Sequence, residues 1–219
     1  HYTRALVNRI KDKVSDEAKP FVHLTATSHD IICTADALRF KDCMENVMIP
    51  DMITLERILI TLALREKDTL QIGRTHGQHA VPITFGFAMA EYVARLGECI
   101  VKIKFSAENL RGKMSGAVGA YNASSLLFKD PEEFERSVLT ELGLKPATHS
   151  TQIVPPESML DLVHNIIVCY GVIANLSDDL RHLSRSEIDE IEESFDDAQV
   201  GSSTMPHKKN PIDFENVKS

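Results

Sequence analysis

Apolar residues recur at helical spacing along most of this chain. Over residues 82–111 they follow one another at steps of three and four, a heptad pattern typical of a long helix packed lengthwise against other helices. The members of this series are Phe85, Met89, Tyr92, Leu96, Cys99, Ile103, Ala107 and Leu110. A second long helix is predicted over about residues 157–193, after the helix-starting Pro155 and Pro156. Its apolar series is Met159, Val163, Ile166, Tyr170, Ile173 and Leu180.

Shorter helices and the breaks between them follow from the remaining pattern. The predicted short helices cover residues 2–13, 31–46 and 52–67. Ser28 or Asp30 is expected to cap the second of them, because short polar side chains accept hydrogen bonds from the free N–H groups of a helix start. The breaks are rich in Gly, Pro, Ser and Thr and lie at residues 73–82, 112–125 and 148–156. Strand signals are scarce, so we predict an all-α fold, a bundle of long helices.

The length of the two predicted long helices bears on assembly. A helix of about 30 residues extends about 45 Å. A compact globule of this size does not need such rods, so we expect a helix bundle shared between subunits. The acidic run DEIEESFDD, residues 189–197, is expected to be a solvated helix end.

Composition narrows the class of protein. The chain has 219 residues, of which 43% are apolar and 26% charged, as is usual for a soluble globular protein. Its net charge of −8 offers no general attraction for nucleic acid or anionic membranes, so neither is an expected partner. No uninterrupted apolar segment reaches the roughly 20 residues of a membrane span. Four widely spaced cysteines without a CxxC pair argue against structural zinc and fit buried thiols in the cytoplasm. The chain begins at His1 rather than Met, so we expect a fragment of a longer protein.

Polar residues with catalytic potential gather in four loops rather than on the helices. These loops are VHLTATSHD around residues 23–30, GRTHGQHA at 73–80, STQ at 150–152 and GSSTMPHKKNP at 201–211. Each lies beside a long helix, and a helix bundle can bring such loops together at its ends.

The residues of three stretches also have purely structural explanations. Thr27, Ser28 and Asp30 could cap the next helix, which on the residues alone is as good an explanation as a functional role. His76 and His79 lack a third metal ligand at helical spacing, so no metal is predicted there. The KMSGAVG stretch, residues 113–119, is expected to be a plain helix connection in preference to an anion-binding nest.

The loop at residues 201–211 suggests chemistry. Gly201 and the two serines after it expose backbone N–H groups, while Lys208 and Asn210 add a cation and an amide in the same small volume. This set suits an anionic group whose charge grows during a reaction, such as a carboxylate beside a forming carbanion. A serine there could act as a nucleophile or as a base, and a histidine elsewhere could supply the complementary acid.

GSSTMPHKKNP resembles the signature loop G-S-S-x-M-P-x-K-x-N-P of the fumarase/aspartase superfamily, homotetrameric lyases that release fumarate from succinyl compounds. The other three loops most resemble the adenylosuccinate lyase branch, since fumarase and aspartase usually have leucine where this chain has Gly77. The resemblance extends over nearly all 219 residues. It implies that residues 1–219 are the central helical domain with the start of the following region, without the family's N- and C-terminal domains.

The resemblance also implies specific roles. Ser202 would be the general base that removes the proton beside a carboxylate, and His76 the general acid that protonates the departing nitrogen, oriented by Glu215. Lys208 and Asn210 would stabilise the doubly charged intermediate. The remaining implied site residues are Thr27, Ser28, Thr75 and Gln152 at the succinyl carboxylates, His23 near the phosphate end of the substrate, His1 as a further active-site histidine and Ser203 as a supporting residue.

The activity that the resemblance implies is cleavage of adenylosuccinate to AMP and fumarate, and of the related succinyl-aminoimidazole carboxamide ribotide, without a cofactor. Its active sites would be shared between the subunits of a homotetramer. Two alternatives stay open. The first is another lyase of the superfamily, such as argininosuccinate lyase or fumarase, and the second is a helical scaffold protein without turnover. His29, Leu24 and Ala26 depart from the usual residues of the first loop, so that loop constrains the reaction class more than the substrate.

Overall fold

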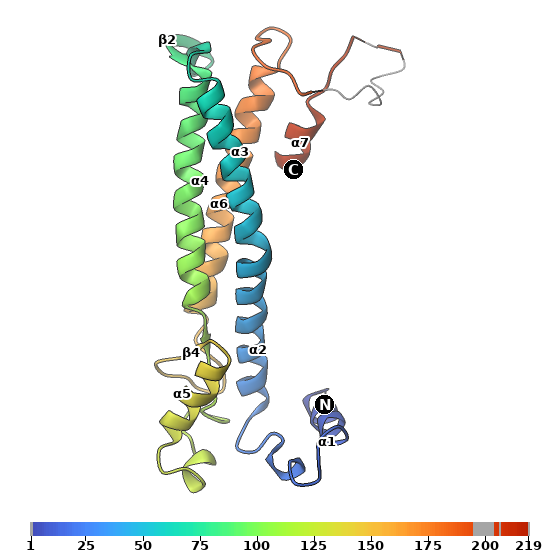
Figure 1. Ribbon diagram of the computed structural model, residues 1–219, viewed down its shortest axis with the longest axis vertical. Helices are drawn as coiled ribbons and strands as arrows, with labels where there is room; N and C mark the ends of the chain where they lie inside the picture. The colour runs from blue at the N-terminus through green and yellow to red at the C-terminus, as the bar shows by residue number, and fades with distance from the viewer. Residues whose placement is uncertain (1, 195–203, 206, 219) are drawn as a thin grey trace. The chain divides into compact units, whose positions relative to one another are not determined.

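The computed structural model describes residues 2–194, 204–205 and 207–218 (Figure 1). These residues form two compact units. Unit 1 contains the chain up to Ile49 together with Ile103–Val163, and unit 2 contains Pro50–Lys102 together with the chain from His164 onward. Most of the described residues are helical, as the sequence predicts, and the strands are short.

Three helices pass through unit 2, namely α3 (Ile49–Arg65), α4 (Phe85–Glu108) and α6 (Glu157–Leu183) (Figure 1). Arg95 of α4 donates to Asn175 of α6 at 3.0 Å, and Tyr92, one turn earlier in α4, bonds to Asp179, one turn later in α6. The two helices are therefore antiparallel, and these polar contacts fix their register. Burial, and then the bond to Asp179, raise the pKa of the Tyr92 hydroxyl.

Helices α3 and α4 approach closely at a glycine. A Cβ atom at Gly86 would lie 2.3 Å from the carbonyl oxygen of Ala63 and 2.6 Å from the backbone nitrogen of Lys67. Any side chain there would push the two helices apart, so this packing requires glycine at residue 86. Farther along, the Glu56 side chain lies against Gly97, which shows that these two helices are also antiparallel.

The apolar seam predicted around α4 is buried. Its members from Met89 to Leu110 are at most 4% exposed. The series predicted for α6 is wrong in detail, because its member Tyr170 is 59% exposed. The buried series of α6 is Leu162, Cys169, Val172 and Leu176. Both series have helical spacing, and spacing alone does not tell which face a single chain buries.

The four cysteines are free thiols. Cys99 and Cys169 are buried and contact each other across α4 and α6, and burial raises the pKa of Cys169 to about 11. Cys43 is exposed and Cys33 is half-buried. The expectation of buried thiols therefore holds for two of the four cysteines.

Unit 1 begins with α1 (Tyr2–Lys11) and a short 3₁₀ helix at Lys19–Phe21, followed by α2 (Ser28–Cys43). The N-cap of α2 is Thr27, and the predicted cap Asp30 completes a capping box by accepting the N–H of Thr27, whereas Ser28 is the first residue of the helix. A π-helical segment, Met44–Met48, follows α2 and continues directly into α3. The two helices predicted at residues 31–46 and 52–67 are therefore joined by helical residues, without the predicted interruption between them.

The rest of unit 1 is built around α5 (Pro131–Glu141). α5 starts after Asp130, whose carboxylate accepts the N–H of Glu133 at 2.8 Å, which is a typical N-cap. Two short strands flank α5 in the sequence, β3 (Arg111–Gly112) before it and β4 (Lys145–Pro146) after it. They pair with each other in parallel. A 3₁₀ turn at Ser124–Leu126 precedes α5. The predicted breaks on both sides of this helix are confirmed.

Residues 73–82, predicted as a break between helices, belong to a β-hairpin. β1 (Leu70–Thr75) pairs antiparallel with β2 (Gln78–Thr84), and the register is irregular between Ile72 and Arg74. Gly73 and Pro82 are typical of breaks. Most of β2 is exposed, so no alternation of apolar and polar residues marks it as a strand.

Helix α6 ends at Leu183, well before the predicted end. Residues 189–194, the described part of the acidic run, are therefore irregular chain and not a helix end. The last element is α7 (Ile212–Lys218). By length and composition alone α6 could cross a membrane, and the core helices of soluble proteins pass the same test.

We predict that Leu139→Ala lowers the free energy of unfolding by about 2–5 kcal/mol, because Leu139 is fully buried in α5 and its loss leaves a cavity. Leu142→Ala is the matched control. That leucine, at the end of the same helix, is 43% exposed, so its loss should cost less than half as much. Urea unfolding followed by circular dichroism measures both. Equal costs would contradict the burial of Leu139 within unit 1.

Candidate functional site

Four predicted site residues lie in two segments of unit 1. Thr27 is the N-cap of α2 and Ser28 is its first residue. His23 precedes them with a positive φ of 67°, a backbone conformation that is uncommon for a residue other than glycine. Gln152 is exposed in the irregular segment before α6. The helix-capping explanation is therefore confirmed for Thr27 and Asp30 but not for Ser28, and the start of α2 is also where free N–H groups favour an anion.

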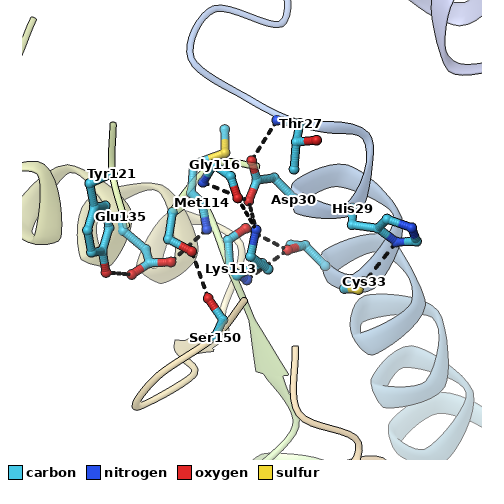
Figure 2. A network of polar contacts seen from close by, with 12 residues as sticks. Thr27, His29, Asp30, Cys33, Lys113, Met114, Gly116, Tyr121, Glu135 and Ser150 are labelled. Carbon is cyan, nitrogen blue, oxygen red and sulfur yellow. Dashed lines mark hydrogen bonds and ion pairs between the residues drawn. The ribbon is translucent and has the colours of Figure 1, made fainter. Parts of the chain in front are cut away.

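A fully buried ion pair lies beside this loop (Figure 2). The ammonium of Lys113 contacts the carboxylate of Asp30, and both side chains are 0% exposed. The ammonium also donates to the carbonyl of Gly116 at 2.8 Å. The carboxylate accepts the N–H of Thr27 through Oδ2 at 2.7 Å and the N–H of Gly116 through Oδ1 at 3.2 Å. A buried charge pair needs such additional hydrogen bonds to offset its loss of water.

Residues 113–119 connect this ion pair to the STQ loop. Ser115 Oγ lies 2.8 Å from Ser150 Oγ, and both serines are buried. Gly119 has a positive φ of 75°, and a Cβ there would lie 2.1 Å from the carbonyl oxygen of Ser150. The prediction of a plain helix connection is therefore incomplete, since this segment joins the Thr27 loop to the segment at Ser150.

Glu135 of α5 holds the same segment in place (Figure 2). One of its oxygens accepts the N–H of Met114 at 2.7 Å, and the other accepts the hydroxyl of Tyr121 at 2.5 Å. Burial, and then the bond to Glu135, raise the pKa of Tyr121. No local sequence pattern indicates the long-range contacts of this network, because partners such as Asp30 and Lys113 are 83 residues apart.

The predicted general acid, His76, lies at the tip of the hairpin in unit 2. His76 and Gly77 form the two-residue turn between β1 and β2, with φ values of 54° and 70°. Two consecutive positive φ values match the twist of a hairpin, and glycine adopts them readily. His76 and the neighbouring Thr75 are both exposed. The turn therefore presents both side chains to solvent in this unit.

Glu190 fastens this hairpin to the chain that follows α6. It contacts the guanidinium of Arg74 on β1, and it accepts from Gln71 Nε2 at 3.1 Å. The hydrogen bond from Arg74 is the main reason that the pKa of Glu190 lies below its ordinary value. The expectation that the acidic run is merely solvated is therefore wrong for this residue, whose side chain is only 24% exposed.

The neighbouring acidic residues hold the chain that returns after the serine loop. Glu192 pairs with Lys209 at 2.8 Å, and Glu193 accepts the N–H of Phe214 at 2.9 Å. Within unit 2, residues 190–193 thus contact both the hairpin and the described part of the GSSTMPHKKNP loop.

The predicted site residues at the C-terminal end of the chain that the structure describes, Lys208, Asn210 and Glu215, are exposed. Lys208 closes a turn through its N–H, which donates to the carbonyl of Met205 at 2.9 Å. Asn210 lines a cavity of about 250 Å³, together with His207. Glu215 is exposed in the first turn of α7. Ser202, Ser203 and His1 lie outside the described residues.

The described candidate residues divide between the two units. Unit 1 holds His23, Thr27, Ser28 and Gln152, and unit 2 holds Thr75, His76, Lys208, Asn210 and Glu215. Within the described ranges, no three His, Cys, Asp or Glu side chains group as a metal ion would require. Sequence reasoning missed Lys113, Arg74 and Glu190. Each of them pairs with a residue that is far away in the sequence, Lys113 with Asp30 and Arg74 with Glu190.

A family model described as a lyase matches residues 2–219. The chain belongs to this lyase family. The adenylosuccinate lyase of Archaeoglobus fulgidus is 39% identical over 218 residues, which are 99% of this chain and 48% of the relative. The adenylosuccinate lyases of Pyrococcus abyssi and Aquifex aeolicus are 39% and 37% identical over 99% of this chain and 47% and 48% of their own lengths. The chain thus spans about half the length of these lyase-family relatives, and the resemblance to the fumarase/aspartase superfamily is confirmed.

In this lyase-family chain, Glu190→Gln should remove a pH-dependent part of the stability. Because the pKa of Glu190 is lowered on folding, its carboxylate stabilises the fold fully above the unfolded-state value of 4.5 and loses this effect as pH falls through the lower folded-state value. The difference in unfolding free energy between wild type and Glu190→Gln should therefore be constant above about pH 5 and shrink below about pH 4.5. Urea unfolding at low ionic strength measures it.

Glu187→Gln is the control for this experiment. Glu187 pairs with Arg185, two residues away, and its side chain is 61% exposed. Such a local surface pair contributes little, so its pH-dependent difference should be smaller. A difference for Glu190→Gln that does not change with pH would contradict the pairing with Arg74.

Proposed function

We propose that the full-length protein containing this chain eliminates fumarate from adenylosuccinate to leave AMP, and from succinyl-aminoimidazole carboxamide ribotide in the same way. The observation that carries this proposal is the similarity to relatives named adenylosuccinate lyase, at 37–40% identity over 99% of the chain. Gly77 in the second loop favours this branch over fumarase and aspartase.

The elimination requires a base and an acid that act on one substrate. The base takes the proton from the carbon beside one succinyl carboxylate, and the electrons of that C–H bond form the double bond of fumarate. The C–N bond breaks as the departing nitrogen takes a proton from the acid. Ser202 is proposed as the base and His76 as the acid, oriented by Glu215. Lys208 and Asn210 stabilise the negative charge that accumulates before the C–N bond breaks.

Thr27 and Ser28 are proposed to hold a succinyl carboxylate. Their place at the start of α2 supports this role, because the helix dipole and free N–H groups favour an anion there. Thr75 and Gln152 are proposed to bind the carboxylates as well, and both are exposed. The remaining roles follow the resemblance, with His23 near the phosphate, His1 as a further active-site histidine and Ser203 in support.

We further infer a cytoplasmic homotetramer whose active sites combine residues of different subunits, with residues 1–219 as its central helical domain. Large apolar side chains that remain exposed support such an assembly, since they are typical of interfaces. On α4 they are Phe87, Val101 and Phe105, which are 67–69% exposed. On α6 they are Leu160, Ile167 and Tyr170, which are 58–63% exposed.

Fumarate release from adenylosuccinate by the purified full-length protein tests the activity. Ser202→Ala should lower kcat by about 10²–10⁴-fold, the range for loss of a positioned base, while AMP still binds. Thr204→Ala is the matched control, because residue 204 is a variable position of the signature and the variant should retain turnover. A folded wild-type protein that releases no fumarate from adenylosuccinate would contradict the proposal and favour one of the two alternatives, argininosuccinate lyase or fumarase activity, or a scaffold without turnover. Full activity of Ser202→Ala would place the base elsewhere.

Shared active sites predict that two inactive variants restore each other. The variants are His76→Asn and Ser202→Ala, and asparagine is chosen because it tolerates the positive φ of residue 76. If one site takes residue 76 and residue 202 from different subunits, mixed tetramers contain some sites with both native groups, and part of the activity should return. Background activity after verified subunit exchange would mean that one chain supplies both groups.

A further inference from the structure

We propose that Asp30 and Lys113 are positioning residues whose buried ion pair fixes the backbone at Thr27 and Ser28, so that this loop can hold a carboxylate. The inference rests on the proposed function, which assigns carboxylate binding to the loop. Neither Asp30 nor Lys113 needs to touch the substrate, because both are only 1% exposed.

The Asp30 carboxylate links two loops (Figure 2). Oδ2 accepts the N–H of Thr27 at 2.7 Å, which orients the peptide group at the start of α2. Oδ1 contacts the Lys113 ammonium and accepts the N–H of Gly116 at 3.2 Å. Both oxygens are therefore engaged within the protein. Any influence of Asp30 on a ligand must pass through the backbone that it holds.

Lys113 gives this carboxylate a single position. Its backbone N–H donates to Thr34 Oγ1 at 3.1 Å, and its carbonyl accepts the hydroxyl of Thr34 at 3.1 Å. Its ammonium donates to the carbonyl of Gly116 at 2.8 Å as well as contacting Asp30. A lysine held at both its backbone and its ammonium leaves little freedom to the charge that faces it.

The same segment reaches the second group of proposed carboxylate-binding residues. Ser115 Oγ lies 2.8 Å from Ser150 Oγ, two residues before Gln152. The Thr27 loop and the Ser150 segment are thus attached to one support, residues 113–116. A substrate carboxylate that contacts both loops would need them at a fixed separation, and this support supplies it.

The ion pair is not needed merely to fill space. Apolar residues of similar volume often stabilise a core as well as a buried ion pair does. An apolar pair, however, could not accept the N–H groups of Thr27 and Gly116. The contribution that distinguishes Asp30 and Lys113 from an apolar pair is therefore the geometry of the loop, and this contribution can be separated from stability by experiment.

Asp30→Asn, Lys113→Met and the double variant test the inference in the full-length protein. The double variant leaves no unpaired buried charge, so it should fold even where a single variant does not. The control is Glu133→Gln with Arg136→Met, which removes an exposed ion pair of α5 in the same unit. Fumarate and AMP are titrated separately, because fumarate carries only the carboxylates and AMP carries neither of them.

We expect the dissociation constant for fumarate to rise about tenfold or more in the double variant, as when a group that orients binding residues is removed. The dissociation constant for AMP should stay within about twofold of wild type, and KM for adenylosuccinate should rise by a larger factor than kcat falls, because the loop holds substrate and transition state alike. The control variant should match wild type with both probes.

Equal weakening of fumarate and AMP binding would show a merely structural role, and unchanged fumarate affinity in a folded variant would show that the pair does not position the loop. Either result overturns the inference. If the double variant does not fold, Ser115→Ala provides the measurement, since it removes only the bridge to Ser150. It should weaken fumarate binding selectively, and unchanged affinity would likewise count against the inference.

The wild-type protein separates this inference from the proposed function. A wild type that binds fumarate but does not cleave adenylosuccinate contradicts the proposed function, while the fumarate affinities of the variants still decide the positioning role. A wild type that binds neither fumarate nor adenylosuccinate contradicts both.

Discussion

The contact between the Asp30 carboxylate and the Lys113 ammonium is the interaction on which the polar loops of unit 1 depend. Two charges without access to water are tolerated only when nearly every donor and acceptor around them is used. That demand recruits the backbone of Thr27 and Gly116, and the neighbouring Ser115 extends the arrangement to Ser150. An electrostatic requirement therefore has a geometric result, since stretches far apart in sequence acquire fixed relative positions.

Helix packing plays the corresponding part in unit 2. The hairpin follows α3 and leads into α4, so the close approach of these helices at Gly86 brings together the start of β1 and the end of β2. The N–H of Phe85 donates to the carbonyl of Thr69 at 2.9 Å, which closes the base of the hairpin. Arg74 and Glu190 then attach the hairpin to the chain beyond α6. The direction of the tip follows from these contacts.

The sequence was informative where a physical pattern repeats. Burial of α4 recurs at every turn, so its seam from Met89 to Leu110 could be predicted. In α6 two apolar series compete, and which of them is buried depends on neighbours that the pattern does not contain. The hairpin carries Gly73 and Pro82 and has a mostly exposed second strand, so it lacks the alternation that marks strands. The π-helical segment Met44–Met48 could not be predicted, because the spacing of its apolar residues does not differ from the spacing in the flanking helices.

For the candidate site, the four loops could be proposed from their residue types, because glycine, serine, histidine and lysine are residues that bind anions and transfer protons. The contacts that hold those loops in place could not be predicted from the sequence. Asp30 and Lys113 are 83 residues apart, and Arg74 and Glu190 are 116 apart, so each pair is brought together by the fold and leaves no mark in the local sequence. The acidic run illustrates the difference, since composition suggested solvation and Glu190 instead has a specific partner.

The turn at His76 and Gly77 divides two tasks between neighbouring residues. Gly77 accommodates the reversal of the chain, and open space surrounds the point where its side chain would begin. His76, the proposed acid, is exposed directly before it. Because the side chain at residue 76 is exposed, its identity is independent of the buried packing that holds the hairpin, and a substitution there would leave the interior of the helical scaffold undisturbed.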